Sequence, residues 1–395
     1  MITGDVRRAI ARAVAAEGLP PAEPGLRPAG GPGRYGSSVA FAYGEQRLPA
    51  AARIAARLAP SGGIARAEVT GPGFITITID PNELAALPDR IAAAGPGCAA
   101  SDALAGTVVP APPEGDPLAE KTWEKASAAL AAQLTARLAA AAGATVAAPE
   151  DMERSVSPPD REALAVSGEA TVRYSAILAQ PFAGPRSPET EMTPTAAAVD
   201  SGTPAQLAND PRPPATGLAR TAAVADRRDG PGVNPVATAV AWAGADAVRF
   251  ALARAVPGRP PAIEPAIIAR HVMSNPAYAV RYAHARAASG VRWAATGSQA
   301  AAALRHRPAD PGELVLLDAL SWLPERVAAA ARRGRPDEFA RYLEELASAT
   351  IAALIETGHP GNTRAPTDRL AIARAARTGL AAGLGLLGVD APDRL

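Results

Sequence analysis

The C-terminal part of the chain is organised around one segment, residues 270–294, with the sequence RHVMSNPAYAVRYAHARAASGVRWA. Ser274 and Asn275 can cap a helix whose first turn contains Pro276, where a missing backbone N–H costs nothing. From there a mostly apolar set recurs at spacings of three and four, which predicts one helix face: Ala277, Val280, His284, Ala287 and Val291. A neighbouring stripe carries the aromatic residues, and guanidinium groups lie close beside it: Tyr278, Tyr282, Ser289 and Trp293, with Arg281, Arg286 and Arg292.

Two interpretations of this helix are open. In the first, the tyrosines and the tryptophan are core residues of a helical bundle and the arginines form a solvated face. In the second, aromatic planes and arginine side chains together form a surface that stacks unpaired bases and contacts phosphates. Composition gives local support to the second, because nine arginines but only two acidic residues lie between Trp242 and Pro308.

The composition of the chain limits its domain number and argues against disulfide-rich, metal-binding and membrane proteins. A chain of 395 residues suggests two or three domains, and a formal net charge of +1 gives no global attraction to a polyanion. A single cysteine, Cys98, and the lack of a Cys/His cluster predict neither a disulfide framework nor a metal site. No apolar run approaches the roughly 18 residues of a membrane span, and the N-terminus lacks a signal-peptide core. These features predict a cytoplasmic protein without a membrane partner.

The helix itself carries a resemblance. Residues 275–286, NPAYAVRYAHAR, resemble the Asn-Pro-x-Tyr-x-Val-x-Tyr-Ala-His-Ala-Arg signature of arginyl-tRNA synthetases, at the start of their all-α DALR-type anticodon-binding domain. We expect that domain over residues 240–395, with a helix at 240–254 and three helices after the signature, near 314–323, 339–354 and 370–387. The resemblance implies tRNA, most simply an arginine-type tRNA, as the partner. It implies these contact residues: Arg270, His271, Asn275, Tyr278, Arg281, Tyr282, His284, Arg286, Arg292 and Trp293.

Residues 1–94 are predicted to form a small α/β domain. Its elements are a helix from Ile2 to near Gly18, a helix over 38–58, strands at 67–69 and 74–79, and a helix capped by Asp80. This part is similar to the N-terminal additional domain of arginyl-tRNA synthetases, which contacts the D-loop of tRNA around Asp-Tyr-Gln-x-Asn. Tyr35 keeps the tyrosine, whereas Arg34, Gly36 and Ser38 replace the Asp, Gln and Asn. The resemblance implies tRNA contacts by Arg34, Tyr35, Ser37 and Ser38.

The middle of the chain lies where that family has its catalytic Rossmann domain. A strand at 107–110, a loop at 112–122 and a helix at 123–142 resemble the strand, His-x-Gly-His loop and helix of the family, but Ala119 and Thr122 occupy the two histidine positions. Lys121 lies beside them as a candidate phosphate contact, and no Lys-Met-Ser-Lys-Ser loop is present. We expect a reduced α/β, Rossmann-remnant domain over 95–178, with a strand near 170–178. A proline-rich linker, predicted to be disordered, follows at 179–239.

The sequence therefore indicates a paralogue of arginyl-tRNA synthetase with a degenerate, shortened catalytic domain, which binds tRNA or a tRNA-like RNA without aminoacylation activity and without a cofactor. One alternative is an active arginine–tRNA ligase that uses ATP and arginine at an unrecognised site. Another is a regulatory scaffold for a protein partner, in which the RNA surface has been lost. Exposure of the α-helical aromatic residues at 278, 282 and 293 discriminates between the RNA-binding and scaffold hypotheses.

Overall fold

The computed structural model describes residues 2–59, 62–148, 234–296, 311–356 and 366–395. These residues belong to one of the two units into which the chain divides, and the other unit, Ser167–Val233, lies outside them. The predicted strand near 170–178 and most of the proline-rich linker at 179–239 therefore lie outside the described residues. The last part of that linker is helical, because α10 (Pro235–Ala243) begins five positions before the predicted start at Val240. Asn234 caps this helix with its side-chain carbonyl.

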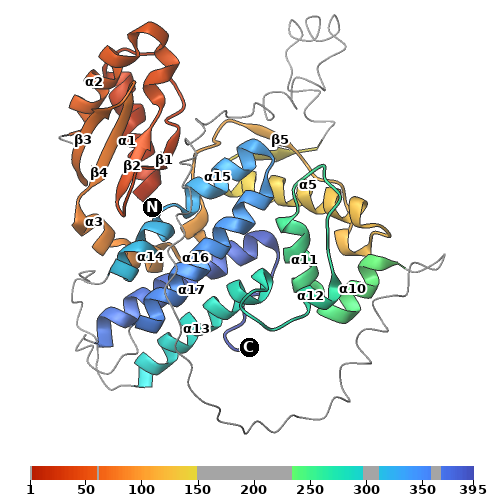
Figure 1. The fold of residues 1–395 in the computed structure, drawn as a ribbon. Helices are drawn as coiled ribbons and strands as arrows, with labels where there is room; N and C mark the ends of the chain where they lie inside the picture. Colours follow the sequence, from red (N-terminus) through yellow and green to blue (C-terminus); the bar gives the residue numbers. More distant parts are fainter. Residues whose placement is uncertain (1, 60–61, 149–233, 297–310, 357–365) are drawn as a thin grey trace, which may run out of the picture. The chain divides into compact units, whose positions relative to one another are not determined.

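The N-terminal domain is an antiparallel four-stranded sheet with helices (Figure 1). In chain order its elements are α1 (Ile2–Ala16), β1 (Leu26–Pro28), β2 (Arg34–Ser37), η1 (Val39–Gln46), α2 (Arg47–Leu58), β3 (Ile64–Thr70), β4 (Phe74–Ile79), α3 (Pro81–Ala85) and α4 (Leu87–Ala94). The strand order is β1-β2-β4-β3. Two strands were predicted and are confirmed, and two short ones are additional. The helix predicted over 38–58 is wrong in its first half, which is a 3-10 segment broken at Gly44, where φ is 56°.

The alternation of side chains along β4 decides which face of this sheet is buried. Ile75 and Ile77 point into the core with Tyr35 of β2, and all three are fully buried. The core side chains of α1 and α2, among them Ile10 and Ile54, pack in the same cluster. One face of the sheet is therefore covered by helices, as expected for an antiparallel sheet with a single packed face.

The middle of the chain retains a small parallel pair of strands. It contains η2 (Gly95–Ala99), β5 (Val108–Pro110), η3 (Pro117–Ala119), α5 (Trp123–Ala141) and β6 (Thr145–Ala147). β5 and β6 pair in parallel, joined by α5 in a βαβ connection. Leu130, Leu134 and Leu138 of α5 are buried. The predicted strand at 107–110 and the predicted helix at 123–142 are confirmed.

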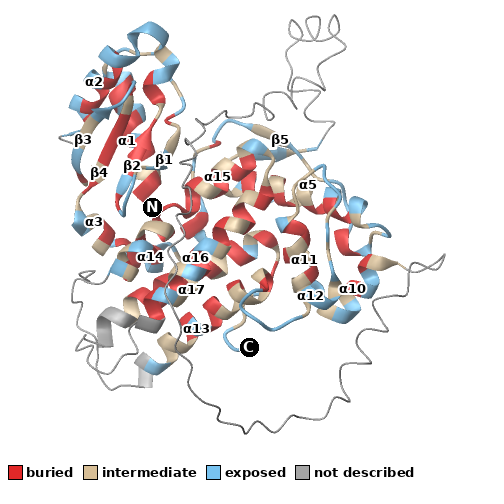
Figure 2. Ribbon diagram, in the orientation of Figure 1, coloured by how far each residue is buried: buried red, intermediate tan, exposed pale blue. Residues whose placement is uncertain are grey.

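The C-terminal part of the described chain is helical. After α10 it contains α11 (Ala245–Arg254), α12 (Pro265–Ile268), α13 (Pro276–Thr296), α14 (Pro311–Ser321), α15 (Leu323–Arg333), α16 (Pro336–Glu356) and α17 (Pro366–Leu387). Four helices follow α13 rather than the three predicted, because Pro324 begins a separate helix, α15, after a turn at Trp322. α13 packs against both α16 and α17, and Figure 2 shows buried residues along these helices. Gly290 lets α13 approach α17 closely, since a Cβ there would lie 3.3 Å from Cβ of Ala373.

Helix α17 contains a segment that is long and apolar enough to be compared with a membrane span. Its 18 residues Leu370–Leu387 are long and apolar enough to cross a membrane, judged by length and composition alone, and half of this window is buried. The expectation that no apolar run approaches this length is therefore wrong here. The buried half includes Leu380, Leu384 and Leu387, which belong to the bundle core. A helix that is central to a bundle passes the same test of length and composition.

A buried polar contact joins the N-terminal domain to the helical part. The Arg7 guanidinium donates to both carboxylate oxygens of Glu325 on α15, with N–O distances of 2.6 and 2.7 Å from Nη2. Both side chains are almost inaccessible, at 11% and 8% exposure. The Tyr35 hydroxyl lies 2.7 Å from the Ser321 hydroxyl, and its ring lies 5.0 Å from that of Trp322. α1 and β2 therefore share one interior with α14 and α15.

Candidate nucleic-acid interface

The start of α13 is fixed by Asn275. Its side-chain oxygen accepts a hydrogen bond from the Ala277 backbone N–H at 3.2 Å, which caps the helix. Its side-chain N–H₂ donates to the carbonyl oxygens of Ile268 and Arg270, at 2.8 and 2.7 Å. Asn275 is only 4% exposed. The predicted RNA contact by this amide is wrong for this structure, because both ends of the amide are used to hold the preceding loop on the helix.

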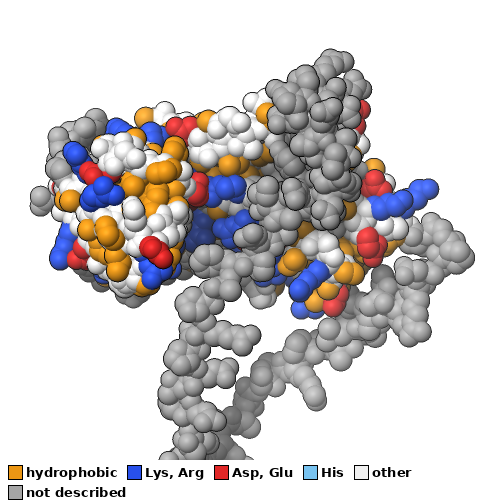
Figure 3. Space-filling view, turned by 90° about the horizontal axis from the view of Figure 1, so that it is seen from above, with side chains coloured by type: hydrophobic (Ala, Val, Ile, Leu, Met, Phe, Trp, Pro, Cys, Tyr) orange, Lys and Arg blue, Asp and Glu red, His pale blue; other side chains and the backbone are white. Residues whose placement is uncertain are grey.

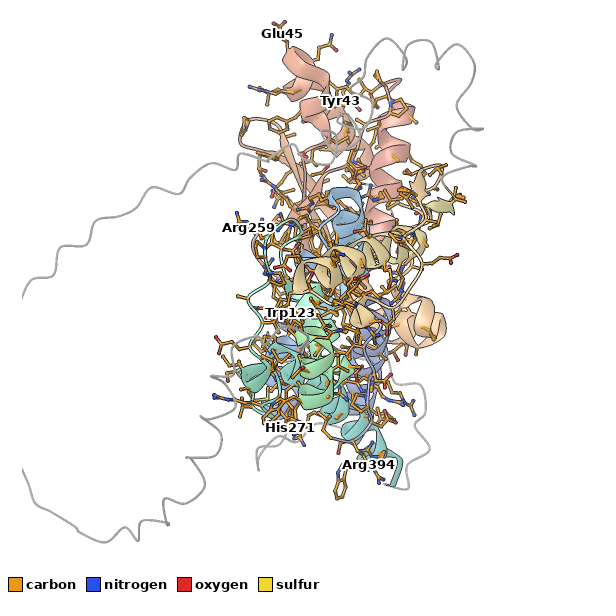
Figure 4. The ribbon with its side chains drawn as sticks, turned by 90° about the vertical axis from the view of Figure 1, so that its right-hand side faces the viewer. Tyr43, Glu45, Trp123, Arg259, His271 and Arg394 are labelled. Carbon is orange, nitrogen blue, oxygen red and sulfur yellow. The ribbon has the colours of Figure 1, made fainter. Side chains whose placement is uncertain are left out.

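Three aromatic rings form a column on the outer side of this loop and helix. The His271 ring stacks on Tyr278, with centroids 5.4 Å apart and planes 13° apart. Tyr278 in turn stacks on Tyr282, one helical turn further, at 5.9 Å and 24°. His271 is exposed and both tyrosines are half-buried; His271 is labelled in Figure 4. We call these three residues the aromatic column.

Arginine side chains extend this column in one direction. Arg286 follows Tyr278 and Tyr282 at steps of four residues, so it continues the same ridge of α13. Arg286 and Arg270 are exposed, and neither forms an ion pair within the described residues. Trp293, two turns further along, is 77% exposed. The interpretation of all the aromatic residues as core is therefore wrong for this helix.

Two other predicted polar contacts of α13, Arg281 and His284, have partners within the protein. Arg281 forms an ion pair with Asp246 of α11 at 3.4 Å. His284 is 2% exposed, and its Nδ1 lies 2.9 Å from the Pro392 carbonyl oxygen. Burial lowers the pKa of His284, which the hydrogen bond to this carbonyl only partly offsets. His284 therefore has a structural role in this structure, and Arg281, whose side chain is 27% exposed, is engaged in an ion pair and is not part of the exposed ridge.

The last residues of the chain, 388–395, are held against α11, α13 and α17 by hydrogen bonds that the sequence did not predict. Arg292 donates to the Asp393 carbonyl oxygen at 2.9 Å, and Arg377 of α17 donates to both oxygens of the Asp393 carboxylate. Arg249 of α11 donates to the Gly388 carbonyl oxygen at 2.9 Å. Figure 1 shows the C-terminus beside α13. No local pattern could reveal these contacts, since their partners lie on different helices.

A cavity of about 350 Å³ opens beside the start of α13. It is lined mainly by apolar residues of α11, α12 and the loop between them, with arginines at its rim, including Phe250, Arg254, Arg259, Ile263, Ile267 and Pro276. Arg254 is paired with Glu344 at 2.6 Å, whereas Arg259 is exposed and forms no ion pair within the described ranges. Asn275 forms part of the cavity wall, and its side chain also holds the loop that contains His271 of the aromatic column.

The degenerate loop lies at the start of α5. Ala119, Lys121 and Thr122 are all exposed, and the Thr122 hydroxyl accepts from the Lys125 backbone N–H at 3.4 Å as a helix cap. Asp116 caps η3 and lies 3.8 Å from Arg249. Within the part of the chain that the structure describes, no group of three or more His, Cys, Asp and Glu residues could hold a metal ion.

The predicted contacts in the N-terminal domain are distributed over both sides of the sheet. Arg34 is exposed and Ser38 is half-buried. Tyr35 is fully buried, so its ring is not open for stacking on a base, and burial raises the pKa of its hydroxyl. Ser37 is also buried and donates to the Pro24 carbonyl oxygen at 2.5 Å. The predicted RNA contacts by Tyr35 and Ser37 therefore do not fit this structure.

Comparison with known proteins defines the class of this bundle. Residues 280–395 match the model of the DALR anticodon binding domain. This match begins within α13 and runs to the end of the chain, so the similarity to anticodon-binding domains covers α13 to α17. An arginine–tRNA ligase of Micrococcus luteus is 37% identical over 171 residues, which cover 40% of this chain and 30% of that protein. One of Frankia alni is 36% identical over 164 residues, covering 38% and 29%.

The fold agrees with these sequence matches. The solved arginyl-tRNA synthetase of Thermus thermophilus superposes with a TM-score of 0.60 at 16% identity, covering 100% of both chains. The chain is thus related to the arginyl-tRNA synthetase family and carries a DALR anticodon binding domain. It spans less than a third of the length of the curated relatives named above.

Proposed function

We propose that this protein binds tRNA, most simply an arginine-type tRNA, through the outer ridge of α13. The observation that carries the proposal is the aromatic column, which continues into the exposed, unpaired Arg286 near the start of the segment, residues 280–395, that matches the DALR anticodon binding domain. Stacked rings accept unpaired bases of any sequence, and an exposed guanidinium binds phosphate. Of the residues predicted from the sequence, this proposal retains Arg270, His271, Tyr278, Tyr282, Arg286 and Trp293.

We further propose that the chain does not aminoacylate tRNA, because its catalytic part is degenerate. Transfer of phosphoryl groups requires positive or hydrogen-bonding groups placed at the developing charge. Ala119 and Thr122 stand at the two histidine positions of the family's motif, and all four histidines of this chain lie at or after residue 271. Thr122 is used as the cap of α5. Domain boundaries at 94 and 178 and a cytoplasmic location are part of this proposal, whereas the predicted boundary at 239 is moved to the start of α10 at Pro235.

The direct test is equilibrium binding of arginine-type tRNA and of an unrelated tRNA at two salt concentrations. Replacing Arg286 with Gln should reduce the slope of log affinity against log salt by about one, as loss of one phosphate contact does. Tyr278→Leu should weaken binding roughly 5- to 150-fold, the range for loss of one base stack. Arg12→Gln is the charge-matched control, since Arg12 is an exposed arginine of α1. Equal affinity of all four proteins would remove α13 from the interface.

Enzymatic activity needs a separate measurement. Pyrophosphate exchange in the presence of arginine, ATP and tRNA should show no activity above background in the purified protein. Exchange that persists in wild type and falls with Lys121→Ala would contradict the inactive assignment and support the ligase alternative. Lys121 is suited to this test because it is exposed and beside the degenerate loop.

A further inference from the structure

A cleft of about 610 Å³ lies between η2, the end of α5, α17 and the last residues of the chain. One face of α17 lines it with small side chains at helical spacings: Thr378, Ala381, Ala382 and Gly385. A Cβ atom at Gly385 would meet no side chain and no other segment within 4 Å, so the helix leaves this space open. The volume lies within the range of roughly 300–1,000 Å³ that is typical of small-molecule sites.

His284 of α13 also lines this cleft, although the residue as a whole is 2% exposed. Its Nδ1 lies 2.9 Å from the Pro392 carbonyl oxygen, which can only accept a hydrogen bond. Nδ1 therefore carries the proton of the neutral ring, and Nε2 presents a lone pair. Burial lowers the pKa of His284, which keeps the ring neutral near neutral pH.

The Nε2 atom of His284 has no hydrogen-bond donor among the residues that the structure describes. Buried polar atoms are normally satisfied, so this acceptor takes its hydrogen bond from whatever occupies the cleft. The small residues of α17 provide space, and His284 independently provides a fixed polar contact within it. The two observations together define a site for a ligand that donates a hydrogen bond.

The charged groups in the lining of the cleft neutralise each other. They are Arg377 of α17 and Asp393, and the guanidinium donates to both carboxylate oxygens, at 3.1 Å from Nε and 3.0 Å from Nη2. The face of the molecule in Figure 3 differs, since basic side chains lie there among hydrophobic ones. An ion in the cleft would give up hydration without a free partner of opposite charge, which favours an uncharged ligand.

We propose that this cleft binds a small, uncharged heteroaromatic molecule that donates an N–H or O–H hydrogen bond to Nε2 of His284. A flat ring suits walls of alanine, glycine and proline, and a rigid ligand loses little conformational entropy when it binds. The occupant is a free molecule rather than a base of a nucleic acid, because the phosphates of a strand would find no unpaired cation in the lining. The inference goes beyond the proposed function and does not rest on it.

The test uses the full-length protein and two probes, fluorine-labelled indole and its N-methyl derivative, with binding followed by fluorine NMR. The probes share the ring system, but the N-methyl derivative has no donor. The N–H probe should bind about 5-fold more tightly, as one ordinary hydrogen bond contributes. A fluorine-labelled indole carboxylate should bind more weakly than the N–H probe, because it carries a charge.

A cavity-filling variant locates the binding. Gly385→Leu places a large side chain in the open space, so it should weaken binding of both indoles at least tenfold. Leucine has a higher helix propensity than glycine, so thermal unfolding should stay cooperative. Arg374→Leu is the matched control, since it introduces the same side chain at an exposed position of α17 outside the lining, and it should bind both probes as wild type does.

The role of His284 is tested by His284→Asn. Asparagine can still donate to the Pro392 carbonyl but has no second ring nitrogen, so the two probes should bind this variant alike. A cooperative unfolding transition is the check that the variant is folded, and Gly385→Leu decides the location of the site independently of it.

Three outcomes would overturn the inference. They are equal affinity of wild type for the two indoles, affinity that Gly385→Leu leaves unchanged, and displacement of the bound indole by tRNA, which would assign the cleft to nucleic acid. The proposed function fails separately, because no residue of the aromatic column lines the cleft. Tyr278→Leu should therefore bind both probes as wild type does, whatever its affinity for tRNA.

Discussion

Replacing Asn275 with Asp should destabilise the protein, although Asp is as good a helix cap as Asn in general. The variant keeps the oxygen that accepts from the Ala277 N–H. It exchanges the side-chain N–H₂ for a second oxygen, which then faces the carbonyl oxygens of Ile268 and Arg270 at the present distances of 2.8 and 2.7 Å. The site is almost closed to water, since Asn275 is 4% exposed.

The magnitude follows from these contacts. Two lost hydrogen bonds cost about 1 kcal/mol each, and leaving two inward carbonyl groups opposite a carboxylate adds about 1–2 kcal/mol. A negative charge at the first turn of α13 returns about 0.3–1 kcal/mol through the helix dipole. The repulsive terms are larger, so we expect a net loss of about 3 kcal/mol near neutral pH. Loss of the hydrogen bond to the Arg270 carbonyl should also make the neighbouring His271 more mobile and weaken its stacking on Tyr278.

The effect of pH gives an internal check. The carboxylate introduced by Asn275→Asp can be relieved by protonation, which restores one donor toward a carbonyl oxygen. The folded state of the variant therefore binds a proton more readily than the unfolded state, and its deficit relative to wild type should shrink as the pH falls. Asn275→Ala has no such group, and its deficit should not change with pH.

Urea denaturation of wild type and both variants at several pH values measures these differences, with linear extrapolation to water. Ser274→Ala serves as the control, because Ser274 is exposed. An Asn275→Asp variant as stable as wild type at neutral pH would refute the assignment of this amide to loop anchoring. The amide would then be available again as an RNA contact.

Two other predictions concern buried polar groups. His284→Asn keeps a donor for the Pro392 carbonyl but does not titrate; because burial lowers the pKa of His284, wild type should lose stability as the pH falls below about 6.5, and this loss should be smaller in the variant. Parallel pH profiles of unfolding would contradict this. Glu325→Gln should cost roughly 1.5–3 kcal/mol, the value of a hydrogen bond to a charged group, because Arg7 keeps its ion pair with Glu23 at 2.7 Å; the Arg7→Met, Glu325→Leu double variant should recover part of this loss. Additive losses in a denaturant double-mutant cycle would refute a coupled pair.

Elements with long regular periodicity were predictable from the sequence. α1, α5 and the signature helix α13 were found because apolar residues recur over several turns. β1 and β2 were missed because they are three and four residues long, and β1 ends at Pro28. α15 was missed although Pro324 lies in its first turn, a position typical of proline, so the sequence does carry a signal for a new helix after Trp322.

The candidate site was predictable as a helix but not residue by residue. Tyr35 was predicted to contact RNA, and its ring is covered by Trp322, a residue nearly three hundred positions away in the chain. His284 finds its acceptor 108 residues later, at Pro392. The contact between Arg27 and the Phe74 ring was missed for the same reason, since Arg27 reaches Phe74 only across the neighbouring strands of a folded sheet. Side-chain type indicates what a residue can do, whereas the fold decides which partner it meets.

The helix signature therefore combines two kinds of residue that share a polar or aromatic character. Asn275 and His284 satisfy carbonyl groups inside the protein, and these contacts stabilise the bundle whether or not it binds RNA. Tyr278, Tyr282 and Arg286 point outward and make no hydrogen bond or ion pair within the described residues. Packing alone does not require stacked rings at a surface, where apolar area left in water contributes nothing to folding. The case for a retained RNA surface thus depends on these outward residues, and the signature as a whole is evidence mainly for the fold.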